Sequence, residues 1–149
     1  LKVQKQTENC KLAVVTQYPE IKKTAERYGA EVYLNPAPER GIASSLVMGL
    51  EASKEMDCCL FAVADQPWLT AETVLKLLDI YRNSEKGIAA VKKNVMIGNP
   101  CVFSSRYYPE LLHLTGDKGG KKILKQHQED VVFCEVTEAK ELLDVDVPL

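Results

Sequence analysis

The feature that most constrains the fold is an uninterrupted apolar run over residues 58–64, "CCLFAVA". A strand with one solvent-exposed face alternates between apolar and polar residues, and this run does not. It therefore predicts a strand buried on both faces, as in a parallel sheet covered by helices. The acidic residue Asp65 follows directly. In such sheets the crevice that binds ligands opens at the carboxyl ends of the strands.

Strand-like and helix-like segments alternate along the rest of the chain. Short apolar segments predict strands over residues 11–16, 30–34, 87–93 and 130–136, and residues 98–105 predict a turn leading into another strand. Helical spacing of apolar residues predicts helices over residues 19–29, 42–53, 70–82, 107–114 and 118–128. The alternation predicts an α/β fold, a three-layer αβα sandwich with a mainly parallel sheet. A length of 149 residues suits one domain over residues 1–149.

Composition excludes several classes of function. The net charge of −2 argues against a nucleic-acid partner held by a broad basic surface. No apolar run approaches the roughly 20 residues of a membrane-spanning helix, so we expect a cytoplasmic protein without membrane contact. The five cysteines include no C-x-x-C pair and predict buried thiols in a reducing compartment. The two histidines lie at no ligand spacing from a cysteine, which gives a Cys/His metal site little support.

Two acidic segments are candidates for a metal site. Asp65 ends the predicted buried strand, and Thr70 already offers an N-cap for the next helix, so Asp65 is not needed there. Near the C-terminus, alternation puts Asp144 and Asp146 on one face of an extended segment. Mg²⁺ takes one or two carboxylates and otherwise waters and substrate phosphates. The alternatives are a capping or turn role for Asp65 and a solvated tail for residues 144–146.

Two loops have features of anion-binding segments. In "ERGIASSL", residues 39–46, Gly41 and the hydroxyls of Ser44 and Ser45 lie at a predicted helix N-terminus. Free N–H groups and the helix dipole favour phosphate or ribose oxygens there. In "TGDKGGKK", residues 115–122, three glycines precede a helix among charged residues. An ordinary helix start and an ordinary turn remain the alternatives.

The sequence offers no recognisable general base. No Ser-His-Asp set or Cys-His pair can be assembled around the two histidines. Chemistry in which the nucleophile is already an anion is therefore favoured. Transfer of a phosphoryl or nucleotidyl group to an existing phosphate is such a reaction, because metal clamping and positioning carry the catalysis.

Four stretches, taken in order, resemble one family: "GIASSLVMGL", "VADQPWLT", "GNPCVFSSRYYPELLHLTGDKGGKKIL" and "LLDVDVPL". They are similar to the MobA-like NTP transferase domain, most of all to its molybdenum cofactor cytidylyltransferase branch. The resemblance implies a Rossmann-like nucleotide-diphosphosugar transferase fold. It also implies transfer of CMP from CTP, with Mg²⁺, to the terminal phosphate of molybdopterin cofactor, with release of pyrophosphate. A molybdenum hydroxylase would be the client of the product.

The resemblance also implies roles for individual residues. Asp65 matches the metal-binding Asp of the D-x-P motif, and Asp146 matches the second Asp of D-I-D-T-P. Both are thus expected to be catalytic metal ligands. The segments expected to bind the nucleotide or the cofactor contribute Gly41, Ser44, Ser45, Gly49, Gly98, Asn99, Pro100, Gly116, Asp117 and Gly119.

The chain also departs from the family pattern. The family begins with a strand and a triphosphate loop of the form L-A-A-G-x-S-x-R-M-G-x-x-K, which these 149 residues do not contain. Asn99 stands where His is common, and Val147 where Thr is common. Two alternatives to a cytidylyltransferase follow. One is a non-catalytic module that binds a cofactor or partner, and the other is an NTP transferase that uses GTP or a sugar phosphate acceptor.

Overall fold

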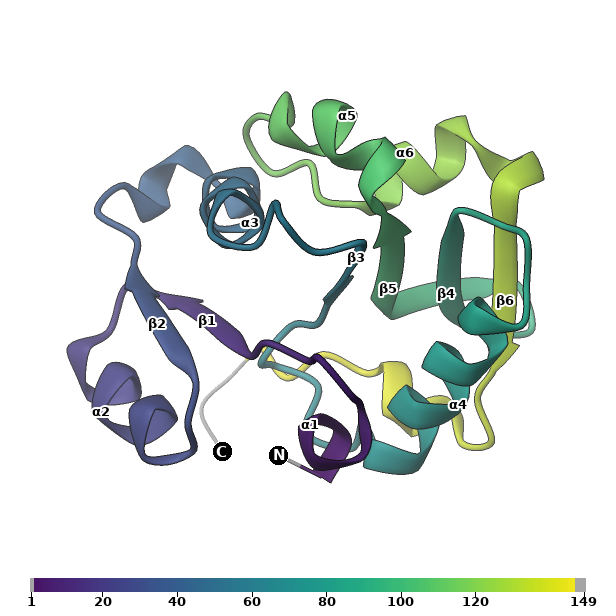
Figure 1. Cartoon of the computed structure of the whole chain (residues 1–149), viewed down its shortest axis with the longest axis horizontal. Coiled ribbons are helices and arrows are strands. Elements are labelled where there is room, and N and C mark those ends of the chain that lie inside the picture. Colours follow the sequence, from purple (N-terminus) through teal and green to yellow (C-terminus); the bar gives the residue numbers. More distant parts are fainter. Residues whose placement is uncertain (1, 147–149) are drawn as a thin grey trace.

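The computed structural model describes residues 2–146. Its strands form two sheets (Figure 1). A parallel pair contains β1 (Ala13–Thr16) and β2 (Glu31–Leu34). A four-stranded sheet has the order β3-β5-β4-β6, with β3 at Cys58–Phe61, β4 at Ile88–Lys93, β5 at Met96–Ser104 and β6 at Val131–Glu135.

Strand direction in the larger sheet follows from its pairing. β5 runs antiparallel to both of its neighbours, β3 and β4, whereas β6 runs parallel to β4. Three of the four strands therefore share one direction, and β5 alone is reversed. The predicted α/β fold with a mainly parallel sheet is confirmed.

Helices cover both faces of the four-stranded sheet (Figure 1). The α-helices are α1 (Lys2–Gln6), α2 (Pro19–Arg27), α3 (Ile42–Glu51), α4 (Ala71–Arg82), α5 (Tyr108–Leu112) and α6 (Lys121–Gln126). Short 3-10 turns are η1 (Pro38–Arg40), η2 (Ser105–Tyr107), η3 (Gln128–Asp130) and η4 (Ala139–Leu142). Residues of α3, α5 and α6 pack on one face, and those of α4 and η4 on the other.

Alternate residues of β4 point into two separate cores. Ile88 and Ala90 belong to the core under α3, α5 and α6, which also contains Phe103. Ala89 and Val91 belong to the core under α4. This is the period of two expected of a strand covered on both sides. Burying a large aliphatic side chain contributes about 1.5–3 kcal/mol, so this region dominates stability.

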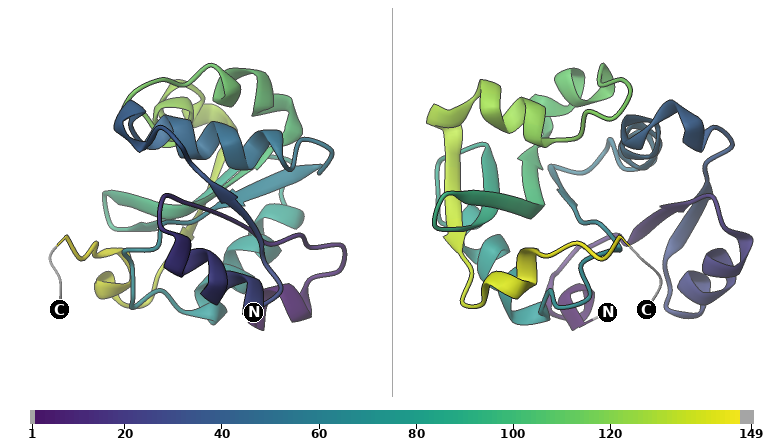
Figure 2. Two further views of the ribbon diagram at one scale, coloured as in Figure 1. Left: turned by 90° about the vertical axis from the view of Figure 1, so that its left-hand side faces the viewer. Right: turned by 180° about the vertical axis from the view of Figure 1, so that it is seen from behind.

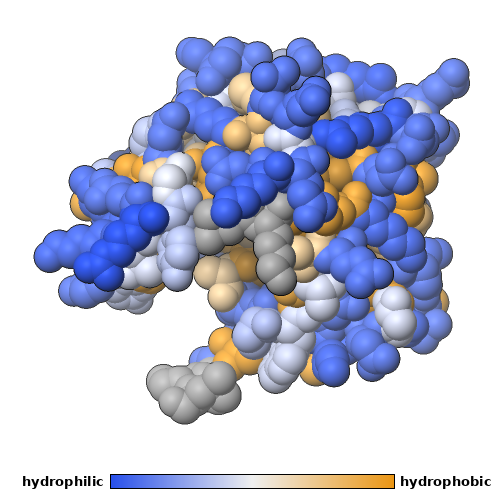
Figure 3. All heavy atoms as spheres, turned by 60° about the horizontal axis from the view of Figure 1, so that its bottom comes forward, coloured by the Kyte–Doolittle hydropathy of each residue, from blue (hydrophilic) through white to orange (hydrophobic). Residues whose placement is uncertain are grey.

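The parallel pair is much less covered. All four residues of β1 are only partly buried, and α2 has no buried residue. Ile21 of α2 is 44% exposed. Seen from behind, β1, β2 and α2 form a lobe at the right of the molecule (Figure 2, right). A space-filling view shows hydrophobic surface between hydrophilic residues (Figure 3). We call β1, β2 and α2 the open half, and the four-stranded sheet with α3 to α6 the closed half.

Two strand predictions were wrong. β3 ends at Phe61 rather than at residue 64, and Ala62 and Ala64 are exposed. The expected burial on both faces is also wrong, because all four residues of β3 are only partly buried. Within residues 2–146, β3 pairs with β5 only, so one of its edges carries no strand and its end is uncovered. Gly98 lies inside β5 rather than in a turn. The turn before β5 lies at Asn94, whose φ is +55°.

Proline inside β5 is explained by an irregularity in the pairing. Ala90 pairs with Cys101 but Val91 pairs with Gly98, so Asn99 and Pro100 have no partner in β4. A proline has no N–H to donate to a ladder, and a bulge of this kind tolerates it.

The cysteine prediction holds in part. Cys101 and Cys134 are buried, and burial raises the pKa of the Cys101 thiol to about 12. Cys58 and Cys59 are only partly buried and Cys10 is exposed, which contradicts the expectation that all five are buried. The reason for the exposure of Cys10 is its place in an uncovered connection before β1. Within residues 2–146, no helix combines the length and the apolar character needed to cross a bilayer.

Candidate functional site

The two predicted acidic segments lie side by side. Asp65 is exposed in the turn that follows β3. The backbone N–H of Val145 donates a hydrogen bond to the backbone oxygen of Asp65 at 2.8 Å. Val145 is flanked by Asp144 and Asp146, both of which are exposed. Two acidic segments that lie eighty positions apart in the sequence thus meet at the turn after β3. We call Asp65, Asp144 and Asp146 the carboxylate site.

The helix after Asp65 is capped without its help. The Thr70 side chain accepts a hydrogen bond from the Thr73 N–H at 3.1 Å at the start of α4. The predicted N-cap role of Thr70 is confirmed. The Asp65 carboxylate is therefore left exposed to solvent rather than used as a cap.

A buried acid ties the C-terminal segment, residues 139–146, to the same helix. Glu141 in η4 is 4% exposed, and its Oε2 accepts from Thr73 Oγ1 at 2.5 Å and Thr70 Oγ1 at 3.1 Å. Burial disfavours the charged form, but the hydrogen bonds from both threonines outweigh it. The pKa of Glu141 therefore lies below its usual value. An ionised Glu141 fixes the segment that carries Asp144 and Asp146.

The predicted segment of Gly98, Asn99 and Pro100 adjoins this C-terminal segment. Gly98 is buried, and a Cβ at this position would lie 3.0 Å from Leu142 Cδ2. A Cβ here would require Leu142 to shift by a few tenths of an ångström, so glycine favours the close approach of η4 to β5. Gly98 thus acts through packing, while Asn99 is half-buried beside Cys101.

A second group of predicted residues gathers at the start of α3. Gly41 has φ of +85°, and a Cβ there would lie 2.5 Å from the backbone carbon of Gly116 and 2.6 Å from Asp117 Oδ1. The Ala43 N–H donates to the Gly116 oxygen at 3.0 Å. Two loops far apart in the sequence therefore meet; we call this the loop junction.

Asn35 organises the two serines at the loop junction. Its Nδ2 donates to Ser44 Oγ at 2.8 Å and to Ser45 Oγ at 2.9 Å, and it is 5% exposed. Ser44 Oγ in turn donates to the Gly41 oxygen at 2.8 Å. Ser44 is thereby engaged in holding the helix start.

The expectation of free amides at this helix start is wrong for two of them. The N–H of Ala43 donates to the Gly116 oxygen, because the 116–117 loop lies directly against the helix. The N–H of Ser44 donates to the Gly41 oxygen three residues earlier, within the first turn. Gly49 allows close packing of α3, since a Cβ there would lie 3.2 Å from Val15 Cγ2. Gly119 faces open space within 4 Å.

The carboxylate site offers exposed carboxylate oxygens, the type of ligand that hard divalent cations take in proteins. In Figure 2 (left) the start of α3 lies above the strands and the C-terminal segment below them. Within residues 2–146, no group of three His, Cys, Asp or Glu side chains could enclose a metal. Mg²⁺ usually binds one or two protein carboxylates and completes its coordination with waters and phosphate oxygens. The number of candidate ligands, Asp65 and Asp146, is consistent with this preference.

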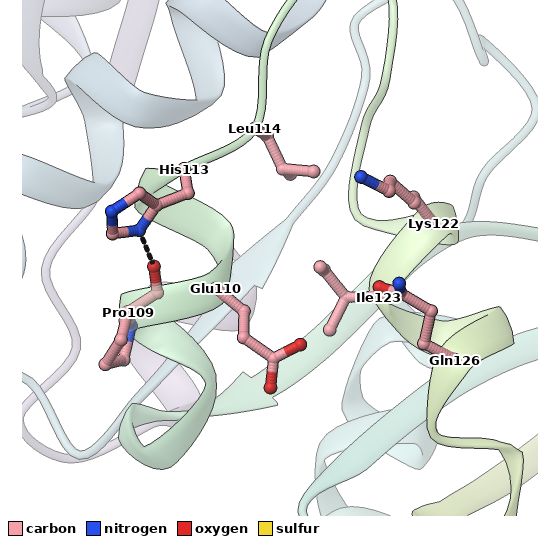
Figure 4. Close-up of a pocket in the computed structure, with 7 residues that line it drawn as sticks. All are labelled: Pro109, Glu110, His113, Leu114, Lys122, Ile123 and Gln126. Atoms are coloured by element: carbon pink, nitrogen blue, oxygen red, sulfur yellow. Dashed lines mark hydrogen bonds between the residues drawn. The ribbon is translucent and has the colours of Figure 1, made fainter.

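A shallow surface pocket of about 400 Å³ lies elsewhere, between α5 and α6 (Figure 4). Its lining includes Glu110, His113 and Lys122 and none of the predicted site residues. His113 Nδ1 lies 2.5 Å from the Pro109 oxygen, and His127 Nε2 lies 2.9 Å from Glu110 Oε2. Both histidines thus have local structural partners.

Helices on both faces of a mainly parallel sheet define the class of layered α/β domains. The chain belongs to the MobA-like NTP transferase domain family, whose model matches residues 3–131. This match includes Asp65 and the loop junction and ends before Asp144. No protein with a curated description matches the sequence significantly.

Solved structures share the fold. Rv0371c from Mycobacterium tuberculosis H37Rv is 25% identical with a TM-score of 0.76, and the alignment covers 97% of this chain and 75% of that one. Mth528, a nucleotidyl transferase from Methanothermobacter, is 20% identical with a TM-score of 0.78, covering 97% and 71%. Molybdopterin-guanine dinucleotide biosynthesis protein A from Archaeoglobus fulgidus is 16% identical with a TM-score of 0.62, covering 98% and 77%. A manganese complex of Rv0371c also matches, with 21% identity, a TM-score of 0.67 and coverage of 91% and 72%.

Sequence reasoning missed three residues. Asn35 follows strand β2 in an Asn-Pro pair, a turn signal that gave no hint of its bonds to two serines. Gln66 is the middle residue of Asp-Gln-Pro, and it is buried although its neighbours are exposed. Glu141 carries no local signal, because its partners Thr70 and Thr73 lie about seventy residues away.

Proposed function

We propose that this chain is a cytoplasmic cytidylyltransferase that transfers CMP from CTP to the terminal phosphate of molybdopterin cofactor. An oxygen of the acceptor phosphate attacks the α-phosphorus of CTP. The bond from this phosphorus to the β-phosphate oxygen breaks, and pyrophosphate leaves. Membership of the MobA-like family supports nucleotidyl transfer. The choice of CTP, of this acceptor and of a molybdenum hydroxylase client rests on the sequence resemblance.

The observation that carries the proposal is the carboxylate site. The hydrogen bond from Val145 to Asp65 brings two acidic segments together at the end of β3. Asp65 and Asp146 would hold Mg²⁺, and the bound ion would neutralise charge on the phosphates. The related manganese complex of Rv0371c supports a divalent cation in this fold. The loop junction, with Gly41 and Ser45, would face the nucleotide.

The test is pyrophosphate release by the full-length protein with Mg²⁺ and molybdopterin cofactor. We expect release with CTP that exceeds release with GTP. Higher activity with GTP than with CTP would indicate a guanylyltransferase instead. A sugar phosphate is the second acceptor to test, beside molybdopterin cofactor. Failure with every pair, while a control enzyme works, would favour a non-catalytic binding module.

Asp65→Asn tests the metal ligand directly. The variant keeps the size of an exposed side chain, so the free energy of unfolding should change by less than about 0.5 kcal/mol. We expect metal-dependent turnover to fall by a factor of about 10² or more, because a charged metal ligand is lost. Wild-type turnover in this variant would remove Asp65 from the site.

A further inference from the structure

Gln66 is a buried amide between exposed neighbours. It is 7% exposed, whereas Asp65 and Pro67 on either side are exposed. Its Nε2 donates a hydrogen bond to Asp144 Oδ1 at 2.9 Å. This bond, which we call the latch, joins the loop after β3 to the C-terminal segment.

The chemistry of the pair fixes the orientation of the amide. An ionised carboxylate only accepts hydrogen bonds, so the NH₂ group of Gln66 has to face Asp144. The amide oxygen then faces inward, and among residues 2–146 no donor reaches it. Burying a polar atom in this way is unfavourable. The favourable contribution of the Gln66 amide is therefore the hydrogen bond that its NH₂ group donates to Asp144.

The latch is adjacent in sequence to the carboxylates of the site on both of the segments that it joins. Gln66 holds the side chain of Asp144, and Asp65 holds the backbone N–H of Val145 at 2.8 Å. Asp146 comes next in the chain. Because carboxylates repel one another, the two neutral partners, the donating Gln66 amide and the accepting backbone oxygen of Asp65, stabilise the acidic segment beside Asp65.

We propose that Gln66 is a positioning residue that, through Asp144, holds Asp146 beside Asp65 as a two-carboxylate site for a divalent cation. Asp144 accepts the hydrogen bond of the latch, so Asp65 and Asp146 are the two carboxylates that would bind the cation. The inference that a cation binds here rests on the proposed function. The hydrogen bond of the latch is observed independently of that function.

Four variants separate the latch from simple charge effects. Gln66→Glu keeps the size but sets two carboxylates against each other. Gln66→Glu with Asp144→Asn restores a hydrogen bond with donor and acceptor exchanged, at the wild-type net charge. Asp144→Ala removes the acceptor from the exposed side, where folding is least at risk. Gln128→Glu makes the same charge change at an exposed site away from the carboxylate site.

Two measurements report on these variants. Native-state hydrogen exchange of the Val145 amide measures how firmly the C-terminal segment is held. Fluorescence of Trp68, the only tryptophan in the chain and 42% exposed two residues from Gln66, reports binding of MnCl₂. We expect Gln66→Glu and Asp144→Ala to raise the exchange rate and the Mn²⁺ midpoint by about ten-fold, the effect of losing one hydrogen bond to a charged group. The double variant should return both toward wild type, and Gln128→Glu should change neither.

The result that overturns the proposal is clear for each measurement. Tighter Mn²⁺ binding by Gln66→Glu would mean that added negative charge matters and the latch does not. Unchanged Val145 exchange in both Gln66→Glu and Asp144→Ala would mean that the segment is held without the latch. If the wild-type protein shows no response to Mn²⁺, the proposed metal-dependent function fails, and the exchange rates still decide the latch.

Discussion

The closed half and the open half are built from the same kinds of element but differ in burial. In β4, four consecutive residues from Ile88 to Val91 are fully buried. In β1, every residue is only partly covered, and α2 contributes no buried side chain. Neither core cluster includes a residue of β1, β2 or α2. Stability is thus concentrated in the closed half, while Asn35, directly after β2, joins the open half to Ser44 and Ser45 of α3.

The largest expected effect comes from a matched pair of isoleucines. Ile88→Ala removes a fully buried side chain of β4 and should lower the free energy of unfolding by about 2–5 kcal/mol. Ile21→Ala makes the same change at a residue that is 44% exposed and should cost less than about 1 kcal/mol. Urea unfolding of both variants measures the difference. Equal losses would show that the open half carries as much stability as the closed half.

A smaller effect is expected at the loop junction. Gly41 has φ of +85° and ψ of 178°, a conformation largely restricted to glycine, and a Cβ would meet the 116–117 loop. Gly41→Ala should therefore cost about 1–3 kcal/mol. Gly119→Ala is the control, because a Cβ there meets nothing within 4 Å. Thermal unfolding compares the two, and similar melting temperatures would argue that the junction is not tightly packed.

The smallest effect concerns Glu141 and depends on pH. The pKa of Glu141 is lower in the folded protein than its ordinary value of 4.5. Its stabilisation is therefore complete above the pKa of the unfolded chain and is lost as the pH falls through the folded value. Glu141→Gln should cost about 1 kcal/mol at pH 7 and less at pH 3.5.

Urea unfolding at both pH values measures this, with Glu138→Gln, at an exposed residue directly before the segment, as the control. A cost that does not change between pH 7 and pH 3.5 would show that the charge of Glu141 does not tie the C-terminal segment to α4.

The sequence predicted what depends on local pattern. Thr70 was identifiable as an N-cap, and Pro19 as the start of a helix, because both roles depend on nearby residues. The end of β3 was misplaced, because the apolar character of Ala62 and Ala64 does not reveal that this edge lacks a neighbour. The turn predicted at Gly98 was wrong, because a glycine and a proline mark a bulge as readily as a turn.

Within the candidate site, the sequence pattern identified residues but not the contacts that they make. Asp65 was found through its position after an apolar run, and the structure places it beside the C-terminal segment. Asn35, Gln66 and Glu141 bind partners from distant parts of the chain, which no local period can reveal. Such long-range polar contacts are decided by packing, and only the folded chain shows them.

The reversed strand β5 has a consequence for how the molecule assembles. β4 and β5 follow one another through the short turn at Asn94, so this central pair can form from a local hairpin. β3 and β6 reach the same hairpin from distant parts of the sequence, and closing long loops is slow. We expect the hairpin to nucleate folding, with the outer strands added to its two edges and the open half ordered last.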